Sequence, residues 1–104
     1  MKIIFDENVP LPLSSFFSGH SVSTVQKEGW AGVENGDIIS NVESRFDVLL
    51  LADKNLRYQQ NLSGRKIALV ELPTNRWPML KQMAGRITNA VETAEPGSYT
   101  VLDY

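Results

Sequence analysis

The sequence of 104 residues contains no cysteine and a single histidine, His20. Without cysteine the chain cannot form a disulfide, bind zinc through thiolates or use a thiol nucleophile, and one histidine cannot build a site of several histidines. Asp, Glu and Asn side chains must therefore supply any metal ligands. Chains of this length form one core, so we expect residues 1–104 to be a single domain.

Long apolar runs and a strong net charge are missing as well. The longest apolar run, Val48 to Ala52, is far shorter than the roughly 20 residues of a membrane-spanning helix, and the opening run Ile3 to Phe5 is too short for a signal peptide. The net charge of −2 creates no general attraction to nucleic acid or to a membrane surface. We therefore expect a cytoplasmic protein that does not bind membranes and that meets any polyanion through a local patch.

Apolar residues alternate along the chain between strand-like and helix-like spacing. Their runs predict buried strands at residues 2–5, 20–25, 48–52, 66–72 and 99–102. Helices are predicted after Pro10 and Pro12 with a stop at Gly19, from Asn35 to Asp47, and from about Pro78 to Pro96. Strands that alternate with helices predict the α/β class, here a three-layer α/β/α sandwich with a mainly parallel sheet of four to five strands.

Two aspartates follow predicted strands at the edge where α/β proteins bind ligands. Asp6 follows the first strand and Asp53 follows the most hydrophobic one, so neighbouring strands would bring these carboxylates to within about 5–10 Å. Two carboxylates at that distance favour a hard cation such as Mg²⁺ or Mn²⁺ between them. A single Asp after a strand commonly caps a helix or starts a turn, but the pair favours a functional site. Glu7 is equally compatible with a third ligand and with a solvated loop charge.

Other polar residues are less specific candidates. Asp37 lies in the first turn after Asn35, where the helix dipole stabilises a carboxylate without any catalytic role, so a structural interpretation is favoured. Lys54 and Arg57 follow Asp53 directly, within a stretch rich in basic residues, and are placed to contact a substrate phosphate. The amide of Gln60 suits a contact with nucleic acid or a turn, and His20 is expected to be a structural hydrogen-bonding residue.

Several motifs together resemble the PIN-like family of small bacterial proteins, relatives of the VapC-type toxin ribonucleases. They are the opening KIIFDENVP at residues 2–10, GHSV at 19–22, GW at 29–30, NGDII at 35–39 and FDVLLLAD at 46–53. The resemblance implies an α/β/α fold whose acidic residues, Asp6 and Asp53 here, hold Mg²⁺ or Mn²⁺ for cleavage of RNA. It also implies RNA, an antitoxin protein and a second copy of the chain as partners.

The chain departs from the family pattern at two places. Many relatives have a second Asp followed by Phe where this chain has Asn55 and Leu56, and an acidic pair where it has Asn35, Gly36 and Asp37. An Asn ligates through its carbonyl oxygen but brings no charge, which weakens cation affinity. The departures indicate a distinct branch of the family.

Three functions follow from these observations. The first is a metal-dependent ribonuclease in which Asp6 and Asp53 hold the ion with help from Asp37 or Asn55, while Lys54, Arg57, Asn35 and Gln60 contact the substrate. The second is a non-catalytic module that binds nucleic acid or an antitoxin through the same residues, which the uncharged Asn55 favours. The third, less favoured, is a phospho-receiver domain, because Asp53 follows a central strand and Thr74 lies near a switch position, although no final helix follows Tyr104.

Overall fold

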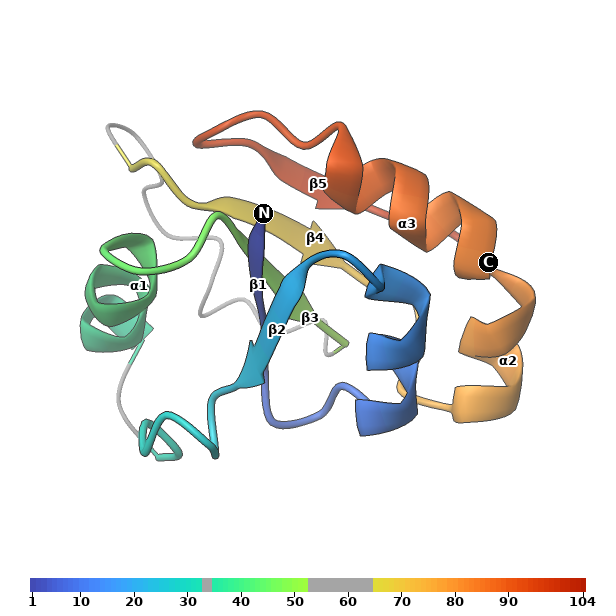
Figure 1. Cartoon of the computed structure of the whole chain (residues 1–104), viewed down its shortest axis with the longest axis horizontal. Helices are drawn as coiled ribbons and strands as arrows, with labels where there is room; N and C mark the ends of the chain where they lie inside the picture. The colour runs from blue at the N-terminus through green and yellow to red at the C-terminus, as the bar shows by residue number, and fades with distance from the viewer. Residues whose placement is uncertain (33–34, 53–64) are drawn as a thin grey trace.

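The computed structural model describes residues 1–32, 35–52 and 65–104, with the side chains of the first helix after the gap described from Ile39 onward. Nine elements occur in these ranges (Figure 1). In order they are β1 (Lys2–Phe5), the 3₁₀ helix η1 (Leu11–Phe17), β2 (Ser21–Thr24), α1 (Asn35–Glu43), β3 (Val48–Leu51), β4 (Ala68–Glu71), α2 (Trp77–Gln82), α3 (Ala84–Glu92) and β5 (Tyr99–Val101).

The strands form one five-stranded sheet in the order β2-β1-β3-β4-β5, and all the neighbours in it are parallel. In the register of β1 and β3, Phe5 pairs with Leu50, and in that of β3 and β4, Leu51 pairs with Glu71. All four residues of β3 are buried, as expected for a central strand that is covered on both faces. The predicted α/β class, the parallel sheet and its five strands are thus confirmed.

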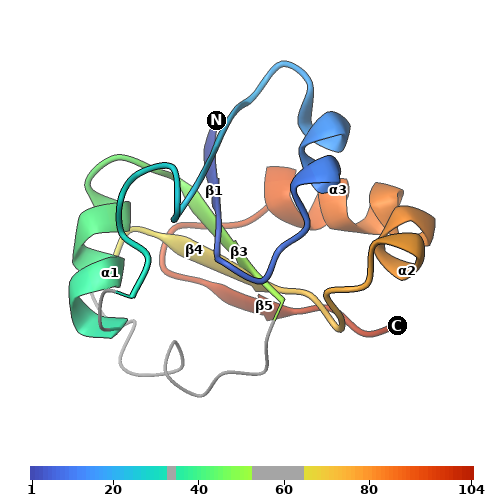
Figure 2. The ribbon, with the colours of Figure 1, turned by 90° about the horizontal axis from the view of Figure 1, so that it is seen from below.

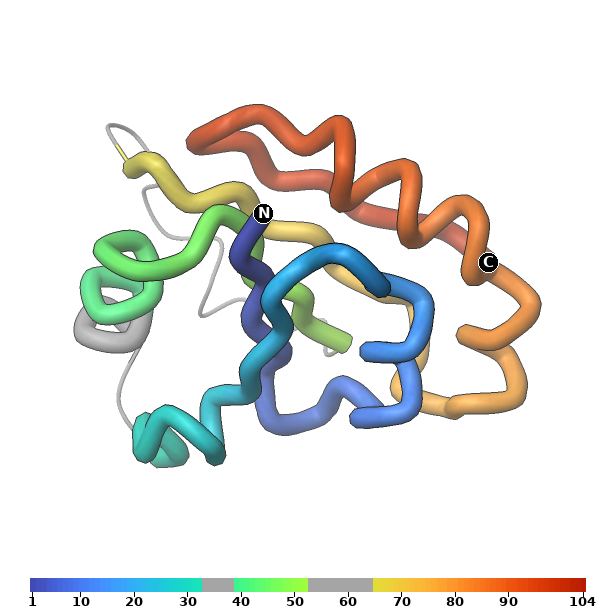
Figure 3. The backbone as a smooth tube through the Cα atoms, in the orientation of Figure 1, coloured from blue at the N-terminus to red at the C-terminus, as the bar shows by residue number. Residues whose placement is uncertain are grey.

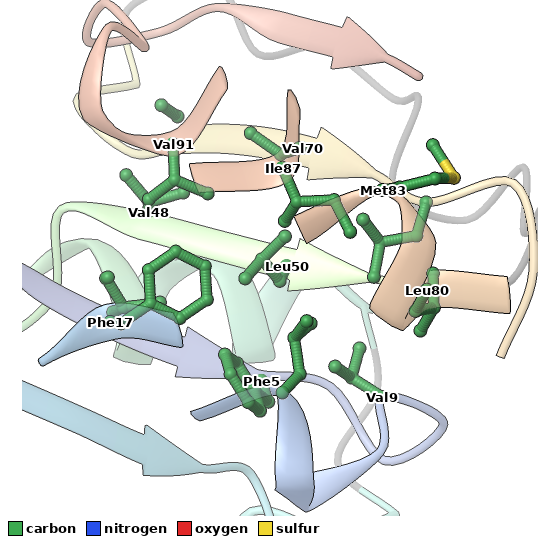
Figure 4. Close-up of a cluster of buried hydrophobic side chains, with 14 residues drawn as sticks. Phe5, Val9, Phe17, Val48, Leu50, Val70, Leu80, Met83, Ile87 and Val91 are labelled. Atoms are coloured by element: carbon green, nitrogen blue, oxygen red, sulfur yellow. The ribbon is translucent and has the colours of Figure 1, made fainter. Parts of the chain in front are cut away.

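The larger of two hydrophobic cores lies on the face covered by η1, α2 and α3. Alternate residues of the strands point into it, and Figure 4 shows Leu50 among Phe5, Val70 and Ile87. The buried members are Ile3, Phe5, Val9, Leu13, Phe17, Val48, Leu50, Ala68, Val70, Leu72, Leu80, Met83, Ile87 and Val91. Complete burial of a large apolar side chain stabilises the fold by about 1.5–3 kcal/mol, so this face supplies most of the apolar stabilisation.

The smaller core lies on the opposite face of the sheet, which α1 covers (Figure 2). Its described members come from the strands, from the residues that flank β2 and β4, and from α1; they are Ile4, Val25, Ile39, Val42, Leu49, Leu51, Ile67 and Leu69. Trp30, Phe46 and Tyr99 pack against its margin. Helical residues therefore contribute to both cores, but unequally.

Helix boundaries are where the structure departs from the sequence predictions. The first helix is a 3₁₀ helix, in which the Ser15 hydroxyl donates to the carbonyl oxygen of Pro12 at 2.9 Å. Seven residues with two serines make a poor α-helix, because serine hydroxyls compete for the backbone groups. The helix expected to reach Asp47 ends at Glu43 instead, and Asp47 accepts a hydrogen bond from the backbone N–H of Lys2 at 2.7 Å.

The last predicted helix is divided in two at Met83, which has the non-helical angles φ −98° and ψ 7°. The tube in Figure 3 follows the change of direction from α2 into α3. Leu80, Met83 and Ile87 all reach the larger core, so the turn allows both short helices to bury their apolar sides against the sheet. Within the described ranges, no helix has the length and apolarity to cross a lipid bilayer.

Candidate functional site

The strand order places the candidate site at the carboxyl ends of β1 and β3. The chain leaves β1 for β2 on one side and later returns to β3 on the other side of β1, so these two strands form the point at which the strand order reverses. Ligands of open α/β sheets bind in the crevice outside such a reversal. Asp6 follows β1 at this point, and Ala52 extends from the end of β3 beside it.

Asp6 is held in place by the backbone and is only 2% exposed. Its N–H donates to the carbonyl oxygen of Leu50 at 2.9 Å, and its own carbonyl oxygen accepts from the N–H of Val9 at 3.1 Å. The first bond extends the pairing of β1 and β3 by one residue, and the second closes a tight turn. A buried carboxylate on such a fixed backbone is expensive to desolvate unless a partner compensates its charge.

The start of α1 lies at the same edge. Because β2 and β3 are parallel, the chain that leaves the carboxyl end of β2 must return along α1 to the amino end of β3, and α1 therefore begins at the carboxyl edge (Figure 2). Asn35 and Asp37 belong to this first turn, although their side chains lie outside the described part of the structure. The topology thus brings the first turn of α1 to the edge of the sheet at which Asp6 lies.

Five further candidates lie outside the described residues. These are Asp53, Lys54, Asn55, Arg57 and Gln60, all within residues 53–64. The described chain reaches this segment at Ala52, directly after β3. Their roles remain predictions from the sequence.

Glu71 is a buried carboxylate that the sequence analysis did not select. It ends β4, is 4% exposed and accepts a hydrogen bond from the Tyr99 hydroxyl at 2.7 Å. Strand alternation puts Glu71 and Asp6 on the same face, and the register puts them on either side of Leu51, with backbones about 10 Å apart. A lone acid inside the apolar run of residues 67–72 was the signal that could have identified it.

Glu7 has a structural partner at the neighbouring loop. Its carboxylate accepts a hydrogen bond from the N–H of Gly32 at 3.1 Å, and its backbone carbonyl accepts from the Gln26 amide at 3.3 Å. Glu7 therefore ties the loop after β2 to the carboxyl edge. The hydrogen bond to Gly32 gives the Glu7 carboxylate a structural role that needs no metal ion.

The donor chemistry at this edge suits a hard cation only if residues beyond the described side chains contribute. Among the described residues, no group of three or more Asp, Glu or His side chains is placed to hold a metal ion. Asp6 provides one buried carboxylate, and Mg²⁺ commonly binds through only one or two carboxylates with water and substrate phosphate. Asp6 would thus fit as one ligand, and Asp53 and Asp37 are the residues that the sequence predicts for a second.

His20 lies away from this edge, at the start of β2. Its Nε2 is 3.0 Å from Oε2 of Glu92, near the end of α3, and its Nδ1 is buried with no hydrogen-bond partner among the described residues. The contact joins the region after η1 to α3. This agrees with the predicted structural role.

Comparison of the chain with protein-family models, with curated proteins and with solved structures gives no match in any of the three.

Proposed function

We propose that the protein is a metal-dependent ribonuclease of the PIN-like type, built as a three-layer α/β/α sandwich. The observation that carries this proposal is the buried Asp6 at the reversal of strand order, beside the end of β3 and at the edge where α1 begins. The two cores on opposite faces of the sheet support the three-layer arrangement. The resemblance of the motifs to PIN-like proteins supports the activity.

In this mechanism Asp6 and Asp53 would hold Mg²⁺ or Mn²⁺, with Asp37 or Asn55 as a further ligand. When bound, the ion would supply activation of water and charge neutralisation at the scissile phosphate. Lys54 and Arg57 contact the phosphate, and Asn35 and Gln60 exchange hydrogen bonds with the RNA. The fixed backbone of Asp6 allows its carboxylate to be positioned before the substrate arrives.

The test is RNA cleavage in Mn²⁺ by the wild type and by two variants, Asp6→Asn and Asp53→Asn. Each variant keeps the shape of the side chain but removes its charge, so we expect at least about a 100-fold loss of rate, equivalent to roughly 3 kcal/mol. Isothermal titration should show weaker Mn²⁺ binding. Asp103→Asn is the matched control, since Asp103 is exposed and near the C-terminal end of the sequence.

Two results would contradict the nuclease. If both variants cleave RNA and bind Mn²⁺ as the wild type does, the proposed site is wrong. If the wild type binds RNA in EDTA yet cleaves none of a varied set of RNAs in Mn²⁺, the chain is the non-catalytic binding module instead.

A phospho-receiver is the second candidate, because its strand order is the one observed here. The order β2-β1-β3-β4-β5 is the flavodoxin-like order, whose ligand site lies at the β1/β3 reversal. Thr74 follows β4, and its hydroxyl accepts a hydrogen bond from the N–H of Arg76 at 3.1 Å. Incubation with acetyl phosphate and Mg²⁺ followed by intact mass measurement decides this candidate: an unmodified Asp53 eliminates it.

A further inference from the structure

A polar groove lies over the first half of β2, away from the carboxyl edge. Its volume is about 220 Å³, and its lining includes Lys2, Ser21, Ser23, Lys27, Glu28 and Arg45. Lys2 pairs with Ser21 across β1 and β2, and Ser23 pairs with Ile4 of the smaller core, so the groove opens on the face that α1 covers. Among the described residues of α1, Ile39 and Val42 belong to this core.

The groove is lined by the basic residues of the first half of the chain, which is acidic as a whole. Lys2, Lys27 and Arg45 are the three basic residues among residues 1–52, and all three line the groove. They are widely separated in the sequence: Lys2 begins β1, Lys27 follows β2 and Arg45 follows α1. Folding therefore concentrates in one hollow every positive side chain of a segment that is negatively charged as a whole.

Glu28, the one acid of the lining, already forms a hydrogen bond and an ion pair. Its Oε2 accepts a hydrogen bond from the Ser23 hydroxyl at 2.6 Å, and its Oε1 is 2.9 Å from Nη1 of Arg45. Its side chain is 15% exposed, whereas that of Arg45 is 59% exposed. Glu28 thus pairs with one guanidinium nitrogen of Arg45, while most of the Arg45 side chain stays exposed.

Neighbouring residues position the Arg45 guanidinium and the turn that carries Lys27. The Arg45 guanidinium lies 5.7 Å from the centre of the Trp30 ring and 5.8 Å from that of Phe46, distances typical of cation–π contacts. The N–H of Lys27 donates to the Thr24 hydroxyl at 3.0 Å, which fixes the turn after β2. Among the described residues, Lys2 and Lys27 have no ion pair, so their ammonium groups are available to an anion.

We propose that this groove binds a backbone phosphate of the RNA strand whose cleavage occurs at Asp6. The inference rests on the proposed nuclease function and adds a second contact for its substrate. Lys2 and Asp6 lie on the same face of one extended segment, four residues apart, which corresponds to about 13 Å. The groove is therefore separate from the scissile phosphate and receives a phosphate further along the strand.

The experiment measures binding of a 5′-fluorescein-labelled single-stranded RNA of mixed sequence by anisotropy, in EDTA to prevent cleavage. The double variant Lys2→Gln/Lys27→Gln is expected to weaken binding about 10-fold at low salt. It should also reduce the slope of log affinity against log salt by roughly 0.7 for each phosphate that the variant no longer neutralises.

The matched control removes the same charge elsewhere. Lys81→Gln/Arg86→Gln changes two exposed basic residues of α2 and α3, on the opposite face of the sheet, and should alter affinity less than threefold. The four substituted side chains, those of both double variants, are exposed, and only the backbone of Lys2 takes part in strand pairing. Circular dichroism should therefore show that both double variants fold as the wild type does.

The outcomes separate this inference from the nuclease proposal. Three results would rule out phosphate binding in the groove. They are wild-type affinity of Lys2→Gln/Lys27→Gln for RNA, an equal loss of affinity in both double variants, and a wild type that does not bind RNA. In the first of these cases the nuclease still stands when Asp6→Asn abolishes cleavage. Conversely, selective loss of binding in a protein that never cleaves RNA supports the groove and rejects the nuclease.

Discussion

The two faces of the sheet differ in what they bury. Among the described residues, the face under η1, α2 and α3 buries only apolar side chains, whereas the face under α1 buries fewer of them and carries Asp6 and Glu71 at its carboxyl edge. The basic groove beside β2 opens on this second face as well. The comparison indicates that one face mainly stabilises the fold, whereas the other also gathers charged side chains.

Leu49 and Leu50 allow the two faces to be compared within a single strand. Both are fully buried neighbours on β3, but Leu50 enters the larger core and Leu49 the smaller one. Leu→Ala substitutions in cores cost about 2–5 kcal/mol, more where the surroundings cannot collapse into the cavity. We expect Leu50→Ala to be the more destabilising in urea unfolding, because three helices fix its surroundings. An equal or larger loss for Leu49→Ala would contradict the proposed division of roles.

The next largest loss of stability is expected when the buried Glu71 loses its hydrogen-bond donor. Removing its donor with Tyr99→Phe leaves a carboxylate that is 4% exposed without its hydrogen bond at 2.7 Å. Loss of a hydrogen bond to a buried charged group costs about 1.5–3 kcal/mol, and we expect urea unfolding to show a decrease of this size. Tyr104→Phe is the control, since Tyr104 is 57% exposed. Equal stability of the two variants would show that the Glu71 carboxylate needs no donor from β5.

A smaller, pH-dependent effect is expected where α1 meets the chain before β4. Nη1 of Arg65 lies 2.7 Å from Oε2 of Glu43, and this hydrogen bond is the main reason that the pKa of Glu43 is lowered from its ordinary value of 4.5. A carboxyl whose pKa falls on folding stabilises the protein above its unfolded pKa, and this contribution is lost as the pH drops through the folded value.

Arg65→Gln tests this contact by thermal unfolding between pH 7 and pH 3. The variant should melt slightly lower than the wild type at pH 7, and the difference should shrink as the pH falls below about 4.5 and Glu43 becomes protonated. Added salt should reduce the difference at pH 7, because the two side chains are partly exposed. A difference that stays constant across this range would mean that Arg65 acts through packing and not through the charge of Glu43.

Most of the secondary structure was predictable because apolar periodicity is a local property. The run Val48 to Ala52 predicts a central strand, and β3 is buried throughout. The break at Met83 was not predictable, because Leu80 and Ile87 continue the same helical stripe. Only the shape of the core beneath them requires the helix to turn. The end of α1 at Glu43 similarly depends on Asp47 bonding to β1.

The candidate site was predictable only in part. Asp6 was found because it follows a strand directly, and the topology then placed the beginning of α1 at the same edge. Glu71 was missed although it is the lone acid of an apolar run, because the sequence does not show its partner: only the fold brings Tyr99 next to it from the adjacent strand.

The spacing of apolar residues, a property of each short segment, determined by itself that this chain alternates strands with helices and that an aspartate follows the first strand. Tertiary structure alone decided which strands are neighbours, and therefore which charged residues meet. Asp6 and Glu71 flank one buried strand, and Lys2, Lys27 and Arg45 share one groove, although the members of each set are far apart in the sequence. The physical reason is that side-chain periodicity is set by local backbone geometry, whereas strand order is set by how the whole chain buries its apolar faces.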